Sequence, residues 1–384
     1  MSFPTHFPPQ VSRTAPCSRP RPWRCGLFFS LVMFTTDQGR NWNRVGLHFN
    51  CMNQFYISLS NNPYFNLAFE RYLFSQIKPE DKILYLWRNS KTVVIGRFQN
   101  PWSECNVEKM NSDSVKLMRR YSGGGAVFQD LGNLCFTLIS GSSYDIDEQK
   151  KINVDFIISA LGEFGIRAYG SGRNDILVDG KKISGSAFQI HSGSLMHHGT
   201  LLVNCDLDKL HLYLNPSKDK LEAKGIKSIR SRVANLHEFN SSISVESLIN
   251  SLKKTYVNKY GDFNLMREIN EDSLSGNLAL KNDYEQLISW DWLYGKTPDF
   301  TDCIKNRFVW GEIQILFNVH QGVIKDVSVF SDTLNNFLVE RLIGALQGKQ
   351  FSNEAIYGAI ITTAETTTNI ETKNLLIDVA ALFQ

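Results

Sequence analysis

The apolar residues of this chain follow two alternating periods from residue 54 onward. Where every second residue is apolar, as in QFYISLS (54–60), the pattern predicts a half-buried strand. Where apolar residues recur every three or four positions, as between Phe65 and Ile77, it predicts a helix, here with Asn62 as N-cap and Pro63 in the first turn. By these criteria we predict strands at 54–60, 82–88, 92–98, 115–120, 126–128, 133–139 and 199–205, and helices at 63–77, 104–110, 152–164 and 244–260.

Two further segments predict β-hairpins. DILVDGKKISGSAFQ (175–189) is two short strands joined at Asp179-Gly180, a pair that favours a tight turn. GEIQILFNVHQGVIKDVSVF (311–330) has the same organisation, with its turn near Gln321-Gly322. Helical patterns follow this second hairpin.

The order of these elements predicts the domain organisation. A polar stretch at 267–283 and the turn-rich YGKTPDF indicate a boundary within 293–302. We therefore predict an α+β chain: a mixed β-sheet with flanking helices at 52–292, a linker at 293–302, and a smaller α/β C-terminal domain at 303–384.

Residues 1–51 differ in composition from the rest of the chain. The first 36 residues contain four arginines, several Ser and Thr and no acidic residue, which is typical of an organelle-targeting segment. Their prolines oppose the amphipathic helix that such segments form. Two interpretations stay open: a transit peptide that makes the protein mitochondrial, or a non-native stretch ahead of a start at Met52, which makes it cytoplasmic.

Composition excludes several classes of protein. The formal net charge is only +3, which disfavours a nucleic-acid partner. Seven cysteines include no C-x-x-C pair, so a disulfide framework and structural zinc are disfavoured. The apolar run CGLFFSLVMF is about half the roughly 18 residues that a transmembrane helix needs, so no membrane partner is expected.

The stretch RRYSGGGAVFQDLGN (119–133) is the first candidate for chemistry. It lacks the G-x-x-x-x-G-K-[ST] pattern, and Phe128 stands where G-x-G-x-x-G would need its third glycine. Consecutive glycines nevertheless let backbone N–H groups cup an anion, and Arg119 and Arg120 have the fork geometry that binds phosphate or carboxylate. Taken alone, the stretch is either a ligand loop or, more commonly, a turn between strands.

The second candidate is GSGRNDILVDGKKISGSAFQ (170–189). Lys182 follows the predicted hairpin turn, and the small residues after it leave room for a ligand beside its ammonium. Asn174 and Asp175 offer hard oxygens suited to Mg²⁺ held with substrate phosphates. The alternatives are a solvated hairpin tip and an ordinary turn.

His197 and His198 are adjacent on a predicted strand, so they face opposite sides of the sheet. A metal site formed by the pair is therefore not expected. One histidine satisfied by hydrogen bonds is the default expectation.

The order of the blocks is more specific than any single one. NPYFNLAFE, LYLWRNSKTVVIGRFQNPWSECN, RRYSGGGAVFQDLGNLCFT, GSGRNDILVDGKKISGSAF, HHGTLLVN, KGIKSIRSRVANL and SWDWLYGKTPDF together resemble lipoate-protein ligase A and, less closely, the mitochondrial lipoyltransferases. The resemblance runs from about residue 54 to the C-terminus and implies the biotin/lipoate ligase fold. It also implies two steps: lipoate and ATP, with Mg²⁺, give lipoyl-AMP and pyrophosphate, and a lysine of an apo lipoyl domain then takes the lipoyl group. The implied acceptors are 2-oxoacid dehydrogenase E2 subunits and the glycine-cleavage H protein.

The resemblance also implies roles for individual residues. Lys182 is the implied catalytic residue, bridging the lipoyl carbonyl oxygen and the AMP phosphate, and Asp175 and Asn174 would serve the metal and phosphates. Gln129 stands where the family usually has histidine, so a titrating role is not expected there. The implied binding residues are Arg120, Ser122, Gly124, Gly125, Ala126, Val127, Phe128, Asn174, Lys182 and His198.

Two alternatives to the full ligase stay open. One is a lipoyltransferase that uses only preformed lipoyl-AMP; the ligase-like block around Lys182 favours the complete reaction over it. The other is a non-catalytic relative that binds a lipoyl domain, for which Gln129 is the only support.

Overall fold

The computed structural model describes residues 52–172, 174–215, 233–294 and 301–384. The N-terminal segment 1–51, most of the predicted linker and much of the block KGIKSIRSRVANL lie outside the described residues.

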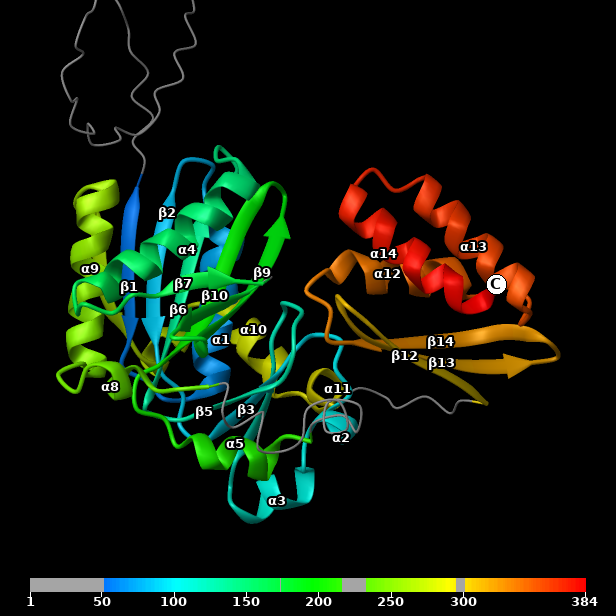
Figure 1. Cartoon of the computed structure of the whole chain (residues 1–384), viewed down its shortest axis with the longest axis horizontal. Coiled ribbons are helices and arrows are strands. Elements are labelled where there is room, and N and C mark those ends of the chain that lie inside the picture. Colours follow the sequence, from blue (N-terminus) through cyan, green and yellow to red (C-terminus); the bar gives the residue numbers. More distant parts are fainter. Residues whose placement is uncertain (1–51, 173, 216–232, 295–300) are drawn as a thin grey trace, which may run out of the picture.

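A mixed eight-stranded sheet forms the larger part of the molecule (Figure 1). Its strand order is β11-β1-β2-β6-β10-β9-β8-β7. β1 pairs in parallel with both of its neighbours, and the other pairings are antiparallel. The strands are β1 (Asn53–Ser58), β2 (Lys82–Trp87), β6 (Asn133–Ser140), β7 (Tyr169–Ser171), β8 (Asp175–Val178), β9 (Lys181–His191), β10 (Ser194–Leu202) and β11 (Leu265–Ile269).

Helices cover both faces of this sheet. α4 (Ile146–Gly162) and α9 (Val245–Tyr260) pack on the face to which Leu84 and Leu86 of β2 point. α1 (Pro63–Gln76) and α10 (Leu278–Ile288) pack on the opposite face, with Tyr85 and Trp87. Because β2 is covered on both faces, its sequence is almost continuously apolar instead of alternating.

A second, three-stranded sheet lies over the α1 face of the large one. It consists of β3 (Thr92–Ile95), paired in parallel with β4 (Lys116–Arg119) and antiparallel with β5 (Val127–Gln129). Val94 and Met118 share one core cluster with Trp87 and Met196 of the large sheet, so the two sheets pack face to face. The outer side carries the short helices α2 (Pro101–Glu104), α3 (Val107–Ser112) and α5 (Leu207–Tyr213).

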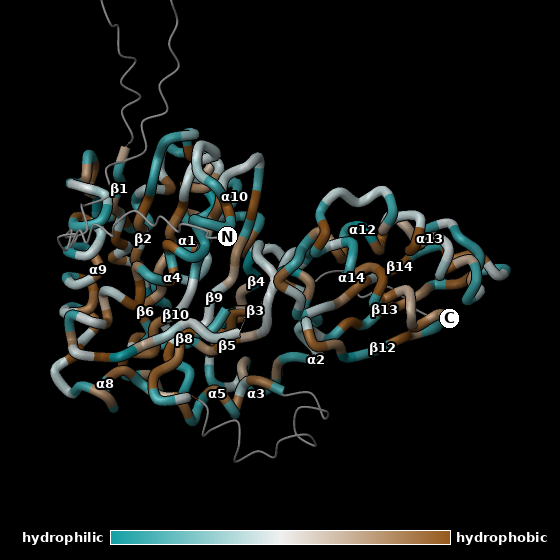
Figure 2. Tube along the Cα trace, turned by 45° about the horizontal axis from the view of Figure 1, so that its top comes forward, coloured by the Kyte–Doolittle hydropathy of each residue, from teal (hydrophilic) through white to brown (hydrophobic). Residues whose placement is uncertain are grey.

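Residues 301–384, here called the C-terminal lobe, have a core of their own (Figures 1 and 2). An antiparallel sheet of three strands is covered on one side by three helices. Ser331 N donates to Phe98 O, and Arg97 pairs with Glu340, so the C-terminal lobe contacts the segment after β3. The elements are β12 (Asp302–Phe308), β13 (Gly311–His320), β14 (Val323–Ser331), α12 (Asn336–Leu346), α13 (Asn353–Glu365) and α14 (Ile370–Ala380).

The remaining elements are short: α8 (Leu236–Phe239), α11 (Trp290–Leu293) and the 3₁₀ turns Glu271–Leu274 and Ala381–Phe383. Among the described residues, no helix combines the length and the apolar character needed to cross a membrane.

The α+β prediction is confirmed, and so are both hairpin turns, whose central residues have positive φ. Two predicted helices have other bounds in the structure. α4 begins six residues earlier than predicted because Asp145 caps it, and the predicted helix at 104–110 is interrupted at Cys105 and restarted by the cap Asn106. The polar stretch 267–283 contains the end of β11 and half of α10, which are partly exposed and therefore lack a clear apolar period.

Candidate active site

The candidate residues gather between the two sheets. On the side of the large sheet, Gly185 of β9 lies opposite Thr200 of β10, and His198 lies opposite Thr137 of β6. On the side of the small sheet, Val127 of β5 and the glycine loop face them. We call this region, with Lys182 at one end and Glu70 at the other, the inter-sheet site.

The glycine loop has a conformation that only glycine satisfies. Gly124 has φ +93°, in the region that favours glycine, and its N–H donates to Thr333 O of the C-terminal lobe at 2.9 Å. A Cβ on Gly123 would lie 2.1 Å from the same carbonyl oxygen, whereas a Cβ on Gly125 would meet nothing within 4 Å. Gly123 and Gly124 thus serve a close contact between backbones, and Gly125 is exposed.

Both arginines before the loop point into the protein. Arg120 is buried and donates through Nε and Nη2 to Gly123 O, through Nη2 to Gly125 O and through Nε to Ser122 Oγ. Burial lowers its pKa to about 10. Arg119 donates instead to backbone carbonyls of α11 and of the segment after β3. In this structure Arg120 fixes the glycine loop, and Arg119 joins α11 to the segment after β3. That either guanidinium group reaches phosphate stays a prediction.

Beneath the loop, a row of buried hydrogen bonds joins three elements. Glu70 of α1 accepts from His198 Nδ1 at 2.8 Å, and His198 Nε2 lies 2.6 Å from Ser122 Oγ. Thr137 Oγ1 also donates to Glu70 at 2.6 Å. A neutral imidazole that gives its proton to Glu70 has Nε2 free to accept the Ser122 proton. The expectation of one satisfied histidine is confirmed for His198.

The order Ser122–His198–Glu70 is that of a nucleophilic triad. Ser122, however, is 0% exposed, and Arg120 donates to its oxygen. A buried hydroxyl with that oxygen already engaged cannot reach a substrate carbonyl, so the row holds the loop in place and does not supply a nucleophile.

Lys182 lies at the opposite end of the inter-sheet site. Its Nζ is 2.7 Å from Asp175 Oδ1, and both side chains are about one-third exposed. A Cβ on Gly185 would lie 2.9 Å from that ammonium, so the glycine provides the room that the sequence predicted. Asn174 Nδ2 donates to Ser186 O at 2.7 Å, which leaves its Oδ1 for a ligand. Lys182 and Asp175 are thereby brought together, and Asn174 binds the backbone of the neighbouring strand β9.

The other predicted binding residues divide by face. Val127 packs toward the large sheet, whereas the Phe128 ring packs against Tyr213 on the outer side, with Ala126 in the same cluster. Only the backbone of Ala126 and Phe128 is therefore in a position to line the inter-sheet site. His197 lies on the far face of the large sheet, stacked on Phe188, as the alternation along the strand predicted.

Gln129 belongs to a chain of three buried amides, and the other two, Asn66 and Asn89, were not predicted from the sequence. Asn89 Nδ2 donates to Gln129 Oε1 at 2.9 Å, and Asn66 Nδ2 donates to Asn89 Oδ1 at 3.0 Å. Asn66 and Glu70 stand one turn apart on the apolar face of α1. Polar residues on the buried face of a helix are unusual, and this is the sequence signal that would have indicated Asn66 and Glu70.

The fit of a magnesium ion depends on Asp175 and Asn174. No group of three or more His, Cys, Asp or Glu side chains suited to a metal occurs in the described part of the chain. One carboxylate and one amide oxygen fit an ion held mainly by substrate phosphates and water, as Mg²⁺ usually is with nucleotides. They do not fit a site made by the protein alone.

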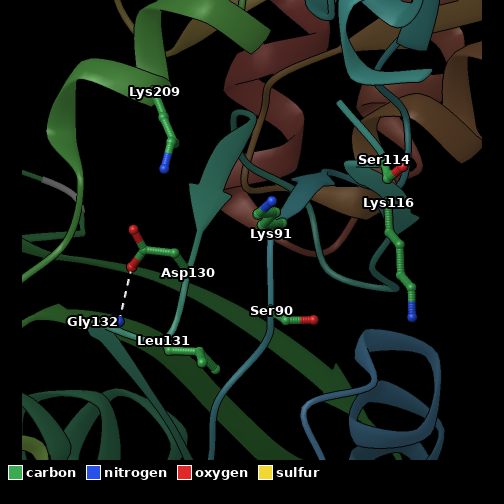
Figure 3. A pocket seen from close by; sticks show the side chains of 8 residues that line it. All are labelled: Ser90, Lys91, Ser114, Lys116, Asp130, Leu131, Gly132 and Lys209. Carbon is green, nitrogen blue, oxygen red and sulfur yellow. Dashed lines mark hydrogen bonds between the residues drawn. The ribbon is translucent and has the colours of Figure 1, made fainter. Parts of the chain in front are cut away.

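A separate open hollow of about 420 Å³ lies beside the turn after β5, the starts of β3 and β4, and α5 (Figure 3). The Asp130 carboxylate accepts from Gly132 N at 2.9 Å and from Asp206 N at 2.9 Å, which fixes the turn between β5 and β6. None of the predicted site residues lines this hollow. Its lining residues are Ser90, Lys91, Ser114, Lys116, Asp130, Leu131, Gly132 and Lys209.

Two protein-family models match this chain, one over most of the part that contains both sheets of the inter-sheet site and one over most of the C-terminal lobe. Residues 62–257 match the lipoyl protein ligase A/B catalytic domain, and residues 297–378 match the bacterial lipoate protein ligase C-terminus. Lipoate-protein ligase A of Psychrobacter cryohalolentis is 48% identical over 300 residues, which cover 77% of this chain and 88% of that protein.

Solved structures show the same similarity. LipL1 of P. falciparum, in complex with lipoate, superimposes with a TM-score of 0.73 at 34% identity, covering 86% of this chain and 98% of that one. A bipartite lipoate protein ligase of Thermoplasma acidophilum, described with its E2 lipoyl domain, gives a TM-score of 0.57 at 27% identity, covering 66% and 99%. A lipoate-protein ligase A bound with ATP gives 0.55 at 26% identity, covering 64% and 99%.

Proposed function

The chain belongs to the lipoate-protein ligase A family, and from that premise we propose that it is an ATP-dependent lipoate–protein ligase. It activates lipoate as lipoyl-AMP and transfers the lipoyl group to a lysine of lipoyl domains, those of 2-oxoacid dehydrogenase E2 subunits and the glycine-cleavage H protein. The observation that carries the proposal is Lys182, whose partly exposed ammonium lies beside Gly185.

In the first step, a lipoate carboxylate oxygen attacks the α-phosphorus of ATP, and the bond to the β-phosphate breaks, releasing pyrophosphate. The chain's own contribution is positioning and charge neutralisation. Lys182 exchanges Asp175 for the substrate oxygens and stabilises the charge that develops on them. Asp175 and Asn174 would hold Mg²⁺, which would neutralise phosphate charge.

In the second step, the acceptor lysine, as a free amine, attacks the acyl carbon and an amide forms. The bond from carbon to the phosphate oxygen breaks, AMP leaves, and the nitrogen loses a proton. Lys182 bridges the carbonyl oxygen and the phosphate, so it stabilises both the tetrahedral intermediate and the leaving group. The hydrogen-bonded row Glu70–His198–Ser122 keeps the loop beside these groups in one conformation.

The test uses the purified full chain with lipoate, ATP, Mg²⁺ and an apo lipoyl domain. We expect pyrophosphate release and a mass increase of the acceptor by one lipoyl group. Folded protein that does neither disproves the proposal. Lipoylation from synthetic lipoyl-AMP, without turnover of lipoate and ATP, would instead identify a transferase.

For residues 1–51 we propose a mitochondrial transit peptide. The arginine-rich, acid-poor composition supports it. N-terminal mass spectrometry of the protein from its native cells would identify a processed terminus. A terminus at Met52 with its formyl or acetyl group would show instead that translation starts there.

A further inference from the structure

Gln129, the last residue of β5, has a carboxamide with one defined orientation. It lies on the same face of β5 as Val127, so its side chain points toward the inter-sheet site. The residue is 4% exposed, and its Oε1 accepts from Asn89 Nδ2 at 2.9 Å. Its Nε2 has no hydrogen-bond partner among the described residues and is the atom left for a ligand.

Backbone carbonyls fix this orientation through the hydrogen-bonded chain Asn66–Asn89–Gln129. Asn66 Nδ2 donates to Ser60 O and Arg88 O, which only accept, so the Asn66 amide cannot be reversed. The same nitrogen lies 3.0 Å from Asn89 Oδ1, which shares one of its two protons and could not be replaced there by a second NH₂ group. Asn89 must therefore offer its nitrogen to Gln129, and Gln129 must turn its oxygen inward.

Along the strand direction, the register places Gln129 level with the start of β6. Across the large sheet, its partners Asn89 and Asn66 lie beside the ends of β1 and β2. A tight turn leads from Gln129 to Asn133, which lies opposite Leu202 of β10. Thr200, two residues before Leu202, lies opposite Gly185, which contacts the Lys182 ammonium. His198 and Glu70 lie farther along the same strands. A donor on the small sheet thus lies at a similar level along the strands as the Lys182 ammonium, with β6 and β10 between β2 and β9 across the large sheet.

We propose that Gln129 is a substrate-binding residue whose Nε2 donates a hydrogen bond to an anionic oxygen of the substrates, and that Asn89 is its positioning residue. The oxygen belongs to the phosphates of ATP or to the lipoate carboxylate, so the proposal rests on the proposed function for the identity of its ligands. A carboxamide does not titrate in the physiological range. This position therefore adds no protonation requirement to the activation step.

The test compares four variants of the full chain in pyrophosphate release and in calorimetric titration with ATP–Mg²⁺ and with lipoate separately. Gln129→Glu keeps the shape but replaces the donor with an acceptor. We expect its affinity for the ligand it contacts to fall roughly 10- to 100-fold, the effect of losing a hydrogen bond to a charged group. Gln314→Glu, the same change on β13 of the C-terminal lobe, is the control and should stay within about twofold of the parent.

Asn89→Asp and Gln129→His test the mechanism itself. In Asn89→Asp, the new carboxylate would accept from Gln129 Nε2 and turn the Gln129 oxygen toward the substrates, so we expect the same loss without any change at residue 129. Gln129→His replaces the carboxamide donor with a ring N–H donor that titrates. Activity should therefore be retained, with a new pH-dependent limb near the ordinary imidazole pKa of about 6.5 that the parent lacks.

The two ligand titrations decide which substrate oxygen Gln129 contacts. Affinities of Gln129→Glu within twofold of the parent for both ligands would overturn the binding role, and a normal Asn89→Asp would overturn the positioning role. Thermal unfolding of each variant identifies a folding defect, in which case Gln129→Met replaces Gln129→Glu. A parent that binds both ligands but releases no pyrophosphate would disprove the proposed function, while the affinities would still test Gln129.

Discussion

Glu70 and Arg120 carry opposite charges inside the protein without touching, because His198 and Ser122 connect them. Arg120 Nε donates to Ser122 Oγ at 3.2 Å, Ser122 lies 2.6 Å from His198 Nε2, and His198 Nδ1 lies 2.8 Å from Glu70. The negative charge of Glu70 also raises the pKa of the Arg120 guanidinium against the larger, opposite effect of its burial. The conformation of the glycine loop thus depends on a carboxylate in helix α1.

Glu70→Ala should destabilise the protein by about 1–3 kcal/mol, because it leaves His198 and Thr137 buried without an acceptor. Urea denaturation measures the change. Glu163→Gln, which removes an exposed ion pair with Lys254, is the control and should cost less than about 1 kcal/mol. Equal stability of the two variants would show that the buried row contributes nothing.

Lys182→Ala should reduce lipoyl transfer about 10²–10³-fold, since it removes the cation that stabilises charge in both steps. Its neighbour Lys181, which pairs with Glu238 at 3.6 Å, provides the matched control. Lys181→Ala should keep activity within about twofold. Initial rates with saturating ATP distinguish the two variants, and comparable losses in both would remove the special role of Lys182.

His197→Leu should reduce the acid sensitivity of the fold. Burial lowers the His197 pKa from 6.5 to about 3, so between these values the unfolded chain binds a proton that the folded protein does not. The titration of His197 therefore costs no stability above pH 6.5, and its destabilising effect grows by about 1.4 kcal/mol per pH unit as the pH falls toward 3.

Urea midpoints from pH 8 to pH 4 should show a shallower decline for His197→Leu than for the parent. Met196→Leu, a volume-conserving change one position earlier on β10, is the control and should keep the slope of the parent. Parallel curves for all three proteins would show that folding does not lower the His197 pKa.

Gly123→Ala should disturb the contact between the glycine loop and the C-terminal lobe. Its Cβ would lie 2.1 Å from Thr333 O, and relief of such a clash typically costs about 1–3 kcal/mol. Amide exchange at Gly124, whose N–H donates to the same carbonyl, should accelerate. Gly125→Ala meets open space and should leave that exchange rate unchanged; acceleration in both variants would mean that the loop opens independently of Thr333.

The sequence predicts the elements of the site better than their contacts. The small residues after Lys182 and the turn at Asp179-Gly180 follow local rules, and both are present as predicted. The partners of Arg120 were not predictable, because they are carbonyls whose direction is set by the packing of two sheets. Strand β11 was missed for a related reason: its three central residues are exposed, so it lacks an alternating apolar pattern, and its pairing with β1 joins residues more than 200 positions apart.

That pairing has a consequence for synthesis of the protein. β1 is an interior strand of the large sheet, yet one of its two neighbours ends only at Ile269. On the ribosome, the free side of β1 must wait for more than half of the chain to emerge, and an unpaired strand edge invites association with other chains. Aggregation of nascent protein, and any need for a chaperone, should therefore end only when β11 has left the exit tunnel.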